Sequence, residues 1–261
     1  AVLGFVAVLV MADRTSVGDG AFAGQPSDRP DSAAEELTQR RSYQRSEIFP
    51  LTLFSLGGMM IFPAADNFVT LFVALEVMSL PLYIMAATAR RRRQLSFEAA
   101  LKYFVLGAFS SGFMLMGAAL LFGFSNSLRI SALGSAISTN TDMDWMVLVG
   151  VLSVMVGLLF KVGAAPFHAW TPDVYTGAPT PVTGFMAAAV KVAAFAAMAR
   201  FYQAVAAYLQ WDFLYVFAAV AVATILVGTF AGLVQDDVKR MLAYSSIAHA
   251  GFILMGILAI Q

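Results

Sequence analysis

Four ionisable side chains lie inside apolar stretches of this sequence that are long enough, or nearly so, to cross a membrane: Glu76, Lys102, Lys161 and Lys191. A charged group at the centre of a spanning helix costs about 2.5–3.5 kcal/mol on insertion scales. Packing against lipid gives no reason to keep such groups, so several in one small chain indicate that protons or ions move through it. The presence of lysine and glutamate at this depth predicts proton transfer, because both side chains can take up and release a proton.

Lys161 occurs beside a predicted helix break. Gly163 and Pro166 follow it within two helical turns. Pro166 has no N–H, and its ring clashes with the carbonyl of Val162, which predicts that the helix breaks or kinks there. Backbone exposed at membrane depth is tolerated only where it faces protein or a water-filled cavity, and broken helices recur in transporters. We therefore expect Lys161 to line a hydrated path.

Lys191 and Glu76 are the deepest of the other charged groups. Lys191 lies about ten residues into the apolar run 181–202, roughly 15 Å along a helix and near the midplane of a ~30 Å hydrocarbon core. Glu76 is central in its own run and is the only deep carboxylate of the sequence. An unpaired carboxylate at that depth would protonate, so we expect Glu76 to pair with a lysine. If its partner is Lys161, separating the pair would let the lysine lose its proton, which makes the pair a switch.

Three further side chains are weaker candidates. Lys102 sits about one turn inside the run 98–123, with Glu98 four residues earlier on the same face, and it either functions or snorkels to the interface. His249 lies mid-run among small residues, where it either relays protons or makes a helix–helix hydrogen bond. His168, next to the predicted break, either conducts protons or caps loose carbonyls.

The composition identifies an integral membrane protein. The chain is 60% hydrophobic and 12% charged, with a mean hydropathy of +0.78, which leaves too little polar surface to solvate a globule. A net charge of zero gives no argument for a nucleic-acid partner. Cysteine is absent, so no disulfide or cysteine-ligated iron–sulfur or zinc site is possible, and the two histidines form no metal or haem pattern. We expect no cofactor in this chain.

Apolar runs of helix length define the predicted topology. They cover residues 48–64, 68–89, 98–123, 145–168, 181–202, 212–233 and 241–260. None alternates as a barrel strand would, so the predicted fold class is an all-α polytopic membrane protein. We interpret 1–11 as a truncated transmembrane helix of a longer chain and 12–47 as a polar, mobile cytoplasmic loop. The Ser-, Asn- and Thr-rich stretch 124–144 is the other long connection.

Basic residues predict the orientation. With helices alternating across the bilayer, segments 12–47, 90–97, 169–180 and 234–240 share one side and hold most arginines, including the run 90–93. Only Arg129 and Arg200 fall on the other side. The excess predicts that the first side faces the cytoplasm or matrix. We expect a multi-pass protein of a bacterial plasma membrane rather than of an energy-converting organelle.

Sequence motifs then suggest a family. The run from Lys161 to Thr183, KVGAAPFHAWTPDVYTGAPTPVT, closely resembles the N subunit of respiratory complex I, the proton-translocating NADH:quinone oxidoreductase. Segments 75–83, 99–112 and 235–251 resemble the same subunit. The residues around Pro166 favour the N subunit over its L- and M-type relatives and over cation/proton antiporters. Together these segments extend over most of residues 48–261.

The resemblance implies an antiporter-like fold of inverted five-helix repeats, each with a broken helix, here near Pro166. Residues 48–202 would be the first repeat, with five transmembrane helices, and 203–261 the incomplete start of the second, with two. Glu76 and Lys161 match the family's glutamate and broken-helix lysine. Lys191 matches the lysine that passes protons toward the middle of the membrane, and His249 a histidine on the central hydrophilic axis. The proton exit path would lie beyond Gln261.

The resemblance also implies what this chain does and what surrounds it. It would translocate protons, while other subunits hold NADH, FMN, iron–sulfur clusters and quinone and perform the redox chemistry. Its partners would be the other membrane subunits of the complex I arm, the lipid bilayer and protons. Two alternatives remain open: a subunit of a multisubunit cation/proton antiporter, and a purely structural membrane-arm subunit whose buried charges only lock helix packing.

Overall fold

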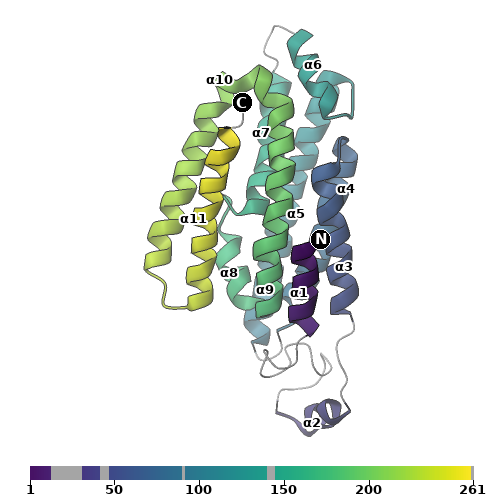
Figure 1. Cartoon of the computed structure of the whole chain (residues 1–261), viewed down its shortest axis with the longest axis vertical. Coiled ribbons are helices and arrows are strands. Elements are labelled where there is room, and N and C mark those ends of the chain that lie inside the picture. Colours follow the sequence, from purple (N-terminus) through teal and green to yellow (C-terminus); the bar gives the residue numbers. More distant parts are fainter. Residues whose placement is uncertain (13–30, 42–46, 90–91, 140–144, 260–261) are drawn as a thin grey trace.

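The chain forms an upright bundle of helices (Figure 1), given by a computed structural model that describes residues 1–12, 31–41, 47–89, 92–139 and 145–259. At residues 39 and 206–213 only the backbone is described. Within these ranges no strand forms, and the only β-type pairing is an isolated bridge between Asn67 and Arg129. The predicted all-α fold class is confirmed.

The helices follow the apolar runs of the sequence. Their bounds are α1 Val2–Ala12, α2 Ala33–Arg40, α3 Ile48–Ile61, α4 Phe68–Ala86, α5 Arg93–Ser125, α6 Ser131–Thr139, α7 Trp145–Val162, α8 Trp170–Gly177, α9 Thr180–Phe185, α10 Lys191–Leu233 and α11 Val238–Leu258. A 3₁₀ turn, η1 Phe62–Ala64, extends α3, and a π-helical turn, η2 Met186–Val190, joins α9 to α10.

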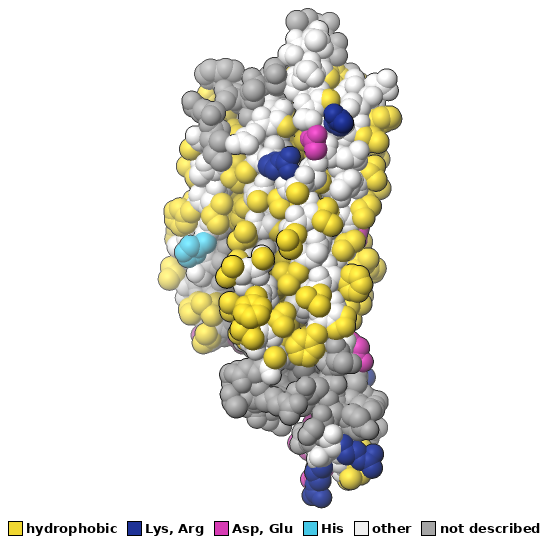
Figure 2. All heavy atoms as spheres, turned by 45° about the vertical axis from the view of Figure 1, so that its right-hand side comes forward, with side chains coloured by type: hydrophobic (Ala, Val, Ile, Leu, Met, Phe, Trp, Pro, Cys, Tyr) yellow, Lys and Arg dark blue, Asp and Glu magenta, His cyan; other side chains and the backbone are white. Residues whose placement is uncertain are grey.

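Among the described residues, six segments are long and apolar enough to cross a membrane. They are Phe68–Ala86, Arg93–Ser125, Trp145–Val162, Thr180–Val205, Leu214–Leu233 and Val238–Leu258. The helices Val2–Ala12 and Ile48–Ala64 are apolar but shorter. Figure 2 shows a wide hydrophobic band on one face, with charged side chains near its two ends, as expected for a surface that meets lipid.

Four segments expected as connections contain helix. The stretch 124–144 holds α6, and 169–180 holds α8. Residues between the predicted spans 181–202 and 212–233 stay helical within α10, whose ribbon turns back at the top of Figure 1. The polar segment 12–47 contains α2, and its parts 13–30 and 42–46 lie outside the described residues.

The unexpected helix α6 begins on a polar anchor. The backbone N–H and the hydroxyl of Ser131 donate to the two carboxylate oxygens of Asp66 at 2.9 and 2.7 Å. These hydrogen bonds lower the pKa of Asp66 below its usual value. Asp66 directly precedes the N-cap of α4, Asn67, whose side chain accepts from the N–H groups of Val69 and Thr70. One short polar stretch therefore starts α4 and positions α6.

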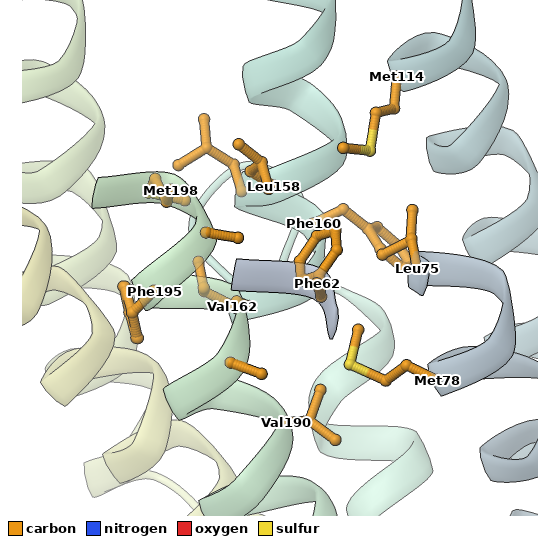
Figure 3. Close-up of a cluster of buried hydrophobic side chains, with 14 of the residues drawn as sticks. Phe62, Leu75, Met78, Met114, Leu158, Phe160, Val162, Val190, Phe195 and Met198 are labelled. Carbon is orange, nitrogen blue, oxygen red and sulfur yellow. The ribbon is translucent and has the colours of Figure 1, made fainter. Parts of the chain in front are cut away.

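The buried core surrounds the residues singled out by the sequence. Figure 3 shows one cluster that includes Leu75, Met78, Phe160, Val162 and Val190. These are close sequence neighbours of Glu76, Lys161 and Lys191 on three different helical segments. The charged groups therefore lie where α4, α7 and the start of α10 pack together.

Close helix packing in this core depends on glycine. A Cβ added at Gly117 of α5 would lie 2.6 Å from the carbonyl oxygen of Gly150 and 2.7 Å from the backbone nitrogen of Val154, both on α7. A Cβ at Gly228 of α10 would lie 2.4 Å from the backbone nitrogen of Ala248 on α11. Small residues at these contacts let the backbones approach, which is how membrane helices associate.

We predict that Gly117→Ala destabilises the folded chain by about 1–3 kcal/mol, because backbone atoms of α7 must move to admit the methyl group. Gly112, also on α5, has no atom within 4 Å of an added Cβ. Gly112→Ala should be neutral or stabilising by up to roughly 1 kcal/mol, since alanine favours the helix. Thermal unfolding of the two variants in detergent makes the comparison, and equal midpoints would contradict the close α5–α7 contact.

Candidate functional site

The break in the seventh helix is built on Gly163. Its φ is +73°, a left-handed conformation that favours glycine. Its N–H donates to the carbonyl of Phe160, and the next N–H, of Ala164, donates to the carbonyl of Leu159, both at 3.0 Å. This pair of bonds is a Schellman motif, which ends a helix and satisfies its last carbonyls. The predicted break is confirmed, but α7 already ends at Val162, so Gly163 rather than the Pro166 ring terminates it.

Polar groups from other elements stabilise the segment after the break. The Ala165 N–H donates to the hydroxyl of Thr224, on the second leg of α10, at 3.0 Å. The indole N–H of Trp170, the first residue of α8, donates to the carbonyl of Phe160 at 3.0 Å. These bonds fix the non-helical backbone inside the bundle, where an unpaired polar group would be costly.

Lys161 is the second-last residue of α7, and its side chain is almost fully buried, at 3% relative exposure. Its ammonium lies 5.7 Å from the ring centroid of Tyr83 and 5.4 Å from that of Tyr103. Both distances fall in the range of cation–π attraction. The lysine thus faces two aromatic rings at the helix break.

Glu76 is partly buried on α4, and one of its carboxylate oxygens has no hydrogen-bond partner among the described residues. Among those residues, no ion pair within 4.0 Å joins it to Lys161. The direct pairing expected from the sequence is therefore absent, although Glu76 is near enough for its charge to act on Lys161. The helices bring the two groups into one region without contact.

Lys191 occupies a distinctive backbone position. It directly follows the π-helical turn η2, an irregularity that occurs frequently at functional sites. Its side chain is 7% exposed, and its ammonium donates to the carbonyl oxygen of Ser246 at 2.9 Å and to the Ser246 hydroxyl. Ser246 belongs to α11. A buried lysine here is therefore held by neutral acceptors.

Lys102 belongs to a charged network at one end of the bundle. Its ammonium pairs with Glu98 at 2.7 Å and with Asp173 of α8 at 2.8 Å. Asp173 also pairs with Arg240 of α11 at 2.8 Å. Burial alone would raise the pKa of Asp173, but hydrogen bonds from Lys102 and Arg240 hold that pKa below its usual value. The network makes Lys102 an anchor of α8, and both roles predicted for it stay predictions.

Neither histidine is hydrogen-bonded to a lysine among the described residues. His249 is exposed on α11, its Nδ1 lies 2.8 Å from the Ser245 carbonyl of the same helix, and its ring packs 6.3 Å from Phe252. No bond from it to another helix is found in the described residues. His168 lies partly buried in the turn between α7 and α8. Within the described ranges no three His, Cys, Asp or Glu residues are grouped to hold a metal ion.

Sequence reasoning missed the aromatic and neutral partners of the lysines. Tyr83 lies seven residues after Glu76, a spacing that puts both on one face of α4 and offered a signal. Tyr103 and Ser246 gave no such signal, because their roles depend on which helix packs against them. Asp173 lies within the run from Lys161 to Thr183 that carries the family resemblance, but nothing in the sequence indicated its two partners.

Comparison with known proteins places this arrangement in a family. The family model described as NADH:quinone oxidoreductase/Mrp antiporter, TM, matches residues 65–261, which contain the break and all six candidate residues. The chain belongs to this family. The antiporter-like fold predicted from the motifs is thereby confirmed.

Individual proteins and solved structures show which members of the family this chain is similar to. The NADH-quinone oxidoreductase subunit N of Beutenbergia cavernae is 53% identical over 265 residues, covering 100% of this chain and 50% of that protein. A chain of respiratory complex I from Thermus thermophilus with bound aureothin has a TM-score of 0.70 and 40% identity, over 84% of this chain and 47% of that one. A chain of the Mrp complex from Dietzia sp. has a TM-score of 0.73 and 26% identity, over 80% and 39%.

These matches bear out the resemblance to the N subunit. The chain spans about half the length of the curated relatives it matches. The matched half holds the broken helix α7–α8 and both buried lysines.

We predict that Asp173→Asn destabilises the full-length subunit by about 1 kcal/mol, because Lys102 and Arg240 lose a charged partner in a half-exposed site. Glu98→Gln, which removes the more exposed partner of Lys102, should cost less than roughly 0.5 kcal/mol. The folded-state pKa of Asp173 is depressed. Its contribution to the free energy of unfolding is therefore present above the ordinary pKa of 3.8 and is lost as the pH falls below that value. Thermal unfolding against pH measures both effects. Equal losses from the two variants would contradict the central place of Asp173.

Proposed function

We propose that this chain is part of the proton-translocating N subunit of an NADH:quinone oxidoreductase, and that Glu76, Lys161 and Lys191 relay protons through its membrane interior. The subunit N relatives at about half identity over the whole chain support the class of protein. The relay is supported by the burial and the partners of the three residues.

One observation is the main support for the proposed relay. Lys161 and Lys191 are 3% and 7% exposed inside membrane-spanning segments, and neither has a carboxylate within ion-pair distance among the described residues. A permanently charged pair would lock two helices together and favour a structural role. Neutral acceptors and aromatic rings instead leave each lysine able to lose its proton without stranding an opposite charge.

In this proposal Glu76 regulates the protonation of Lys161. Its charge acts on Lys161 without contact, so a proton arriving at or leaving Glu76 changes how tightly Lys161 holds its own proton. In this proposal Lys191, which is held against Ser246 of α11, receives the proton next. Lys102, His168 and His249 stay candidates for the ends of the path.

We further propose how the chain sits in its assembly. Residues 48–202 form the first inverted repeat and 203–261 begin the second, with segments 12–47, 90–97, 169–180 and 234–240 on the cytoplasmic side of a bacterial plasma membrane. Electron transfer takes place in other subunits, which hold NADH, FMN, iron–sulfur clusters and quinone. The neighbours of this chain are the other membrane-arm subunits.

The Mrp likeness makes a cation/proton antiporter the second candidate, supported by a TM-score of 0.73 at 26% identity. The higher identity to subunit N relatives favours the respiratory function. Proteoliposomes that hold the intact assembly separate the two. Proton uptake driven by NADH oxidation supports the respiratory function, whereas proton movement that requires a Na⁺ or K⁺ gradient and ignores NADH supports the antiporter.

We predict that Lys161→Met and Lys191→Met each lower NADH-driven proton uptake by roughly tenfold or more in the assembled complex, because methionine keeps the volume and removes the proton carrier. Arg129→Met is the control, since it removes an exposed cation at the other end of the bundle from the Asp173 network and should leave uptake unchanged. NADH oxidation with a soluble artificial acceptor verifies assembly of each variant. Unaltered uptake in both lysine variants would instead support a structural subunit.

A further inference from the structure

The ammonium of Lys161 lies against an aromatic corner formed by two helices. Tyr83 of α4 and Tyr103 of α5 meet edge to face, with ring centroids 4.6 Å apart and planes at 84°. Lys161 approaches both rings, at 5.7 and 5.4 Å from their centroids. Both tyrosines are buried, at 7% and 0% exposure, so water screens the attraction little.

The corner is joined mechanically to the helix break. Tyr103 stacks on Trp170 at a centroid distance of 4.7 Å and an interplanar angle of 11°. The Trp170 indole in turn donates to the carbonyl of Phe160, the residue before Lys161. One continuous set of contacts therefore links the ring that faces the ammonium to the backbone that carries it.

Glycine makes room for the second ring. A Cβ at Gly107 of α5 would lie 2.2 Å from the hydroxyl oxygen of Tyr83, so any side chain there displaces this tyrosine. Gly112, on the same helix, has open space around its Cβ position. A single methyl group at Gly107 would therefore move Tyr83 relative to Lys161.

Lys161 thus has two attractors in the same region. One is the carboxylate of Glu76, which acts on it without contact, and the other is the pair of ring faces. A ring face attracts the protonated ammonium and not the neutral amine, and it needs no counter-charge of its own. A carboxylate offers the stronger attraction but can itself be neutralised by a proton.

We propose that Tyr83 and Tyr103 form an aromatic seat that holds the protonated ammonium of Lys161 while it is separated from Glu76. Both tyrosines are then positioning residues for the relay, which rests on the proposed function of Lys161 as a proton carrier. The ammonium is held by cation–π attraction to the ring faces and not by hydrogen bonds to the hydroxyls. In agreement, the Tyr103 hydroxyl has no hydrogen-bond partner among the described residues.

The test compares Tyr103→Phe with Tyr103→Leu in the assembled complex. Phenylalanine keeps the ring face, so NADH-driven proton uptake should stay within about twofold of the parent, whereas leucine should lower it about five- to thirtyfold. A density map of the Leu variant should show the Lys161 ammonium moved toward Glu76. Equal losses in the two variants, or an unmoved ammonium, would overturn the seat.

Gly107→Ala tests the seat without altering any aromatic residue, which matters if Tyr103→Leu fails to assemble. It should lower uptake at least about fivefold by displacing Tyr83, while Gly112→Ala leaves uptake unchanged. Equal uptake in the two glycine variants would count against the seat. Failure of the relay is distinguishable from failure of the seat. If Lys161 carries no protons, Lys161→Met leaves uptake intact. If the seat does not exist, the map of the unsubstituted complex places the ammonium away from the two rings.

Discussion

The need to hold a buried ammonium group without a permanent counter-charge governs this structure. A charged lysine inside a membrane-spanning helix needs groups that stabilise its ammonium. A fixed carboxylate would do so, but it would also hold the proton on the lysine. Lys161 finds aromatic rings, and Lys191 finds the carbonyl and hydroxyl of Ser246. The rest of the bundle is arranged so that these partners arrive from other helices.

Irregular backbone accompanies both lysines. Lys161 lies just before the Gly163 turn that ends α7, and Lys191 directly follows the π-helical turn η2. A π-helical turn of this kind is frequent at functional sites. The interruption at Gly163 is stabilised by Trp170 and by Thr224, so the non-helical segment is satisfied inside the protein rather than exposed to lipid.

The two halves of the chain meet at these groups. Thr224 and Ser246 belong to the second leg of α10 and to α11, and they bind the break and Lys191 respectively. At one end of the bundle Asp173 connects α8 to α5 and α11 through Lys102 and Arg240. The short helix after the break is therefore held by both α5 and α11, which gives it a defined position relative to these two helices.

The sequence by itself determined which segments are apolar helices, where the chain breaks and which charged side chains lie deep in the membrane. These properties are local, because apolar run length, glycine and proline placement and the transfer cost of a charge depend on nearby residues. Pro166 was the predicted cause of the break, whereas the left-handed turn at Gly163 ends α7.

Only the tertiary structure decided the partners of the buried lysines. Whether Lys161 meets Glu76 or the rings of Tyr83 and Tyr103 depends on how α4, α5 and α7 are rotated and how closely they approach. The helix α8 was missed for a similar reason, since the ion pairs of Asp173 with α5 and α11 are long-range contacts. Short-range patterns carry no record of such long-range contacts, so packing alone selected them.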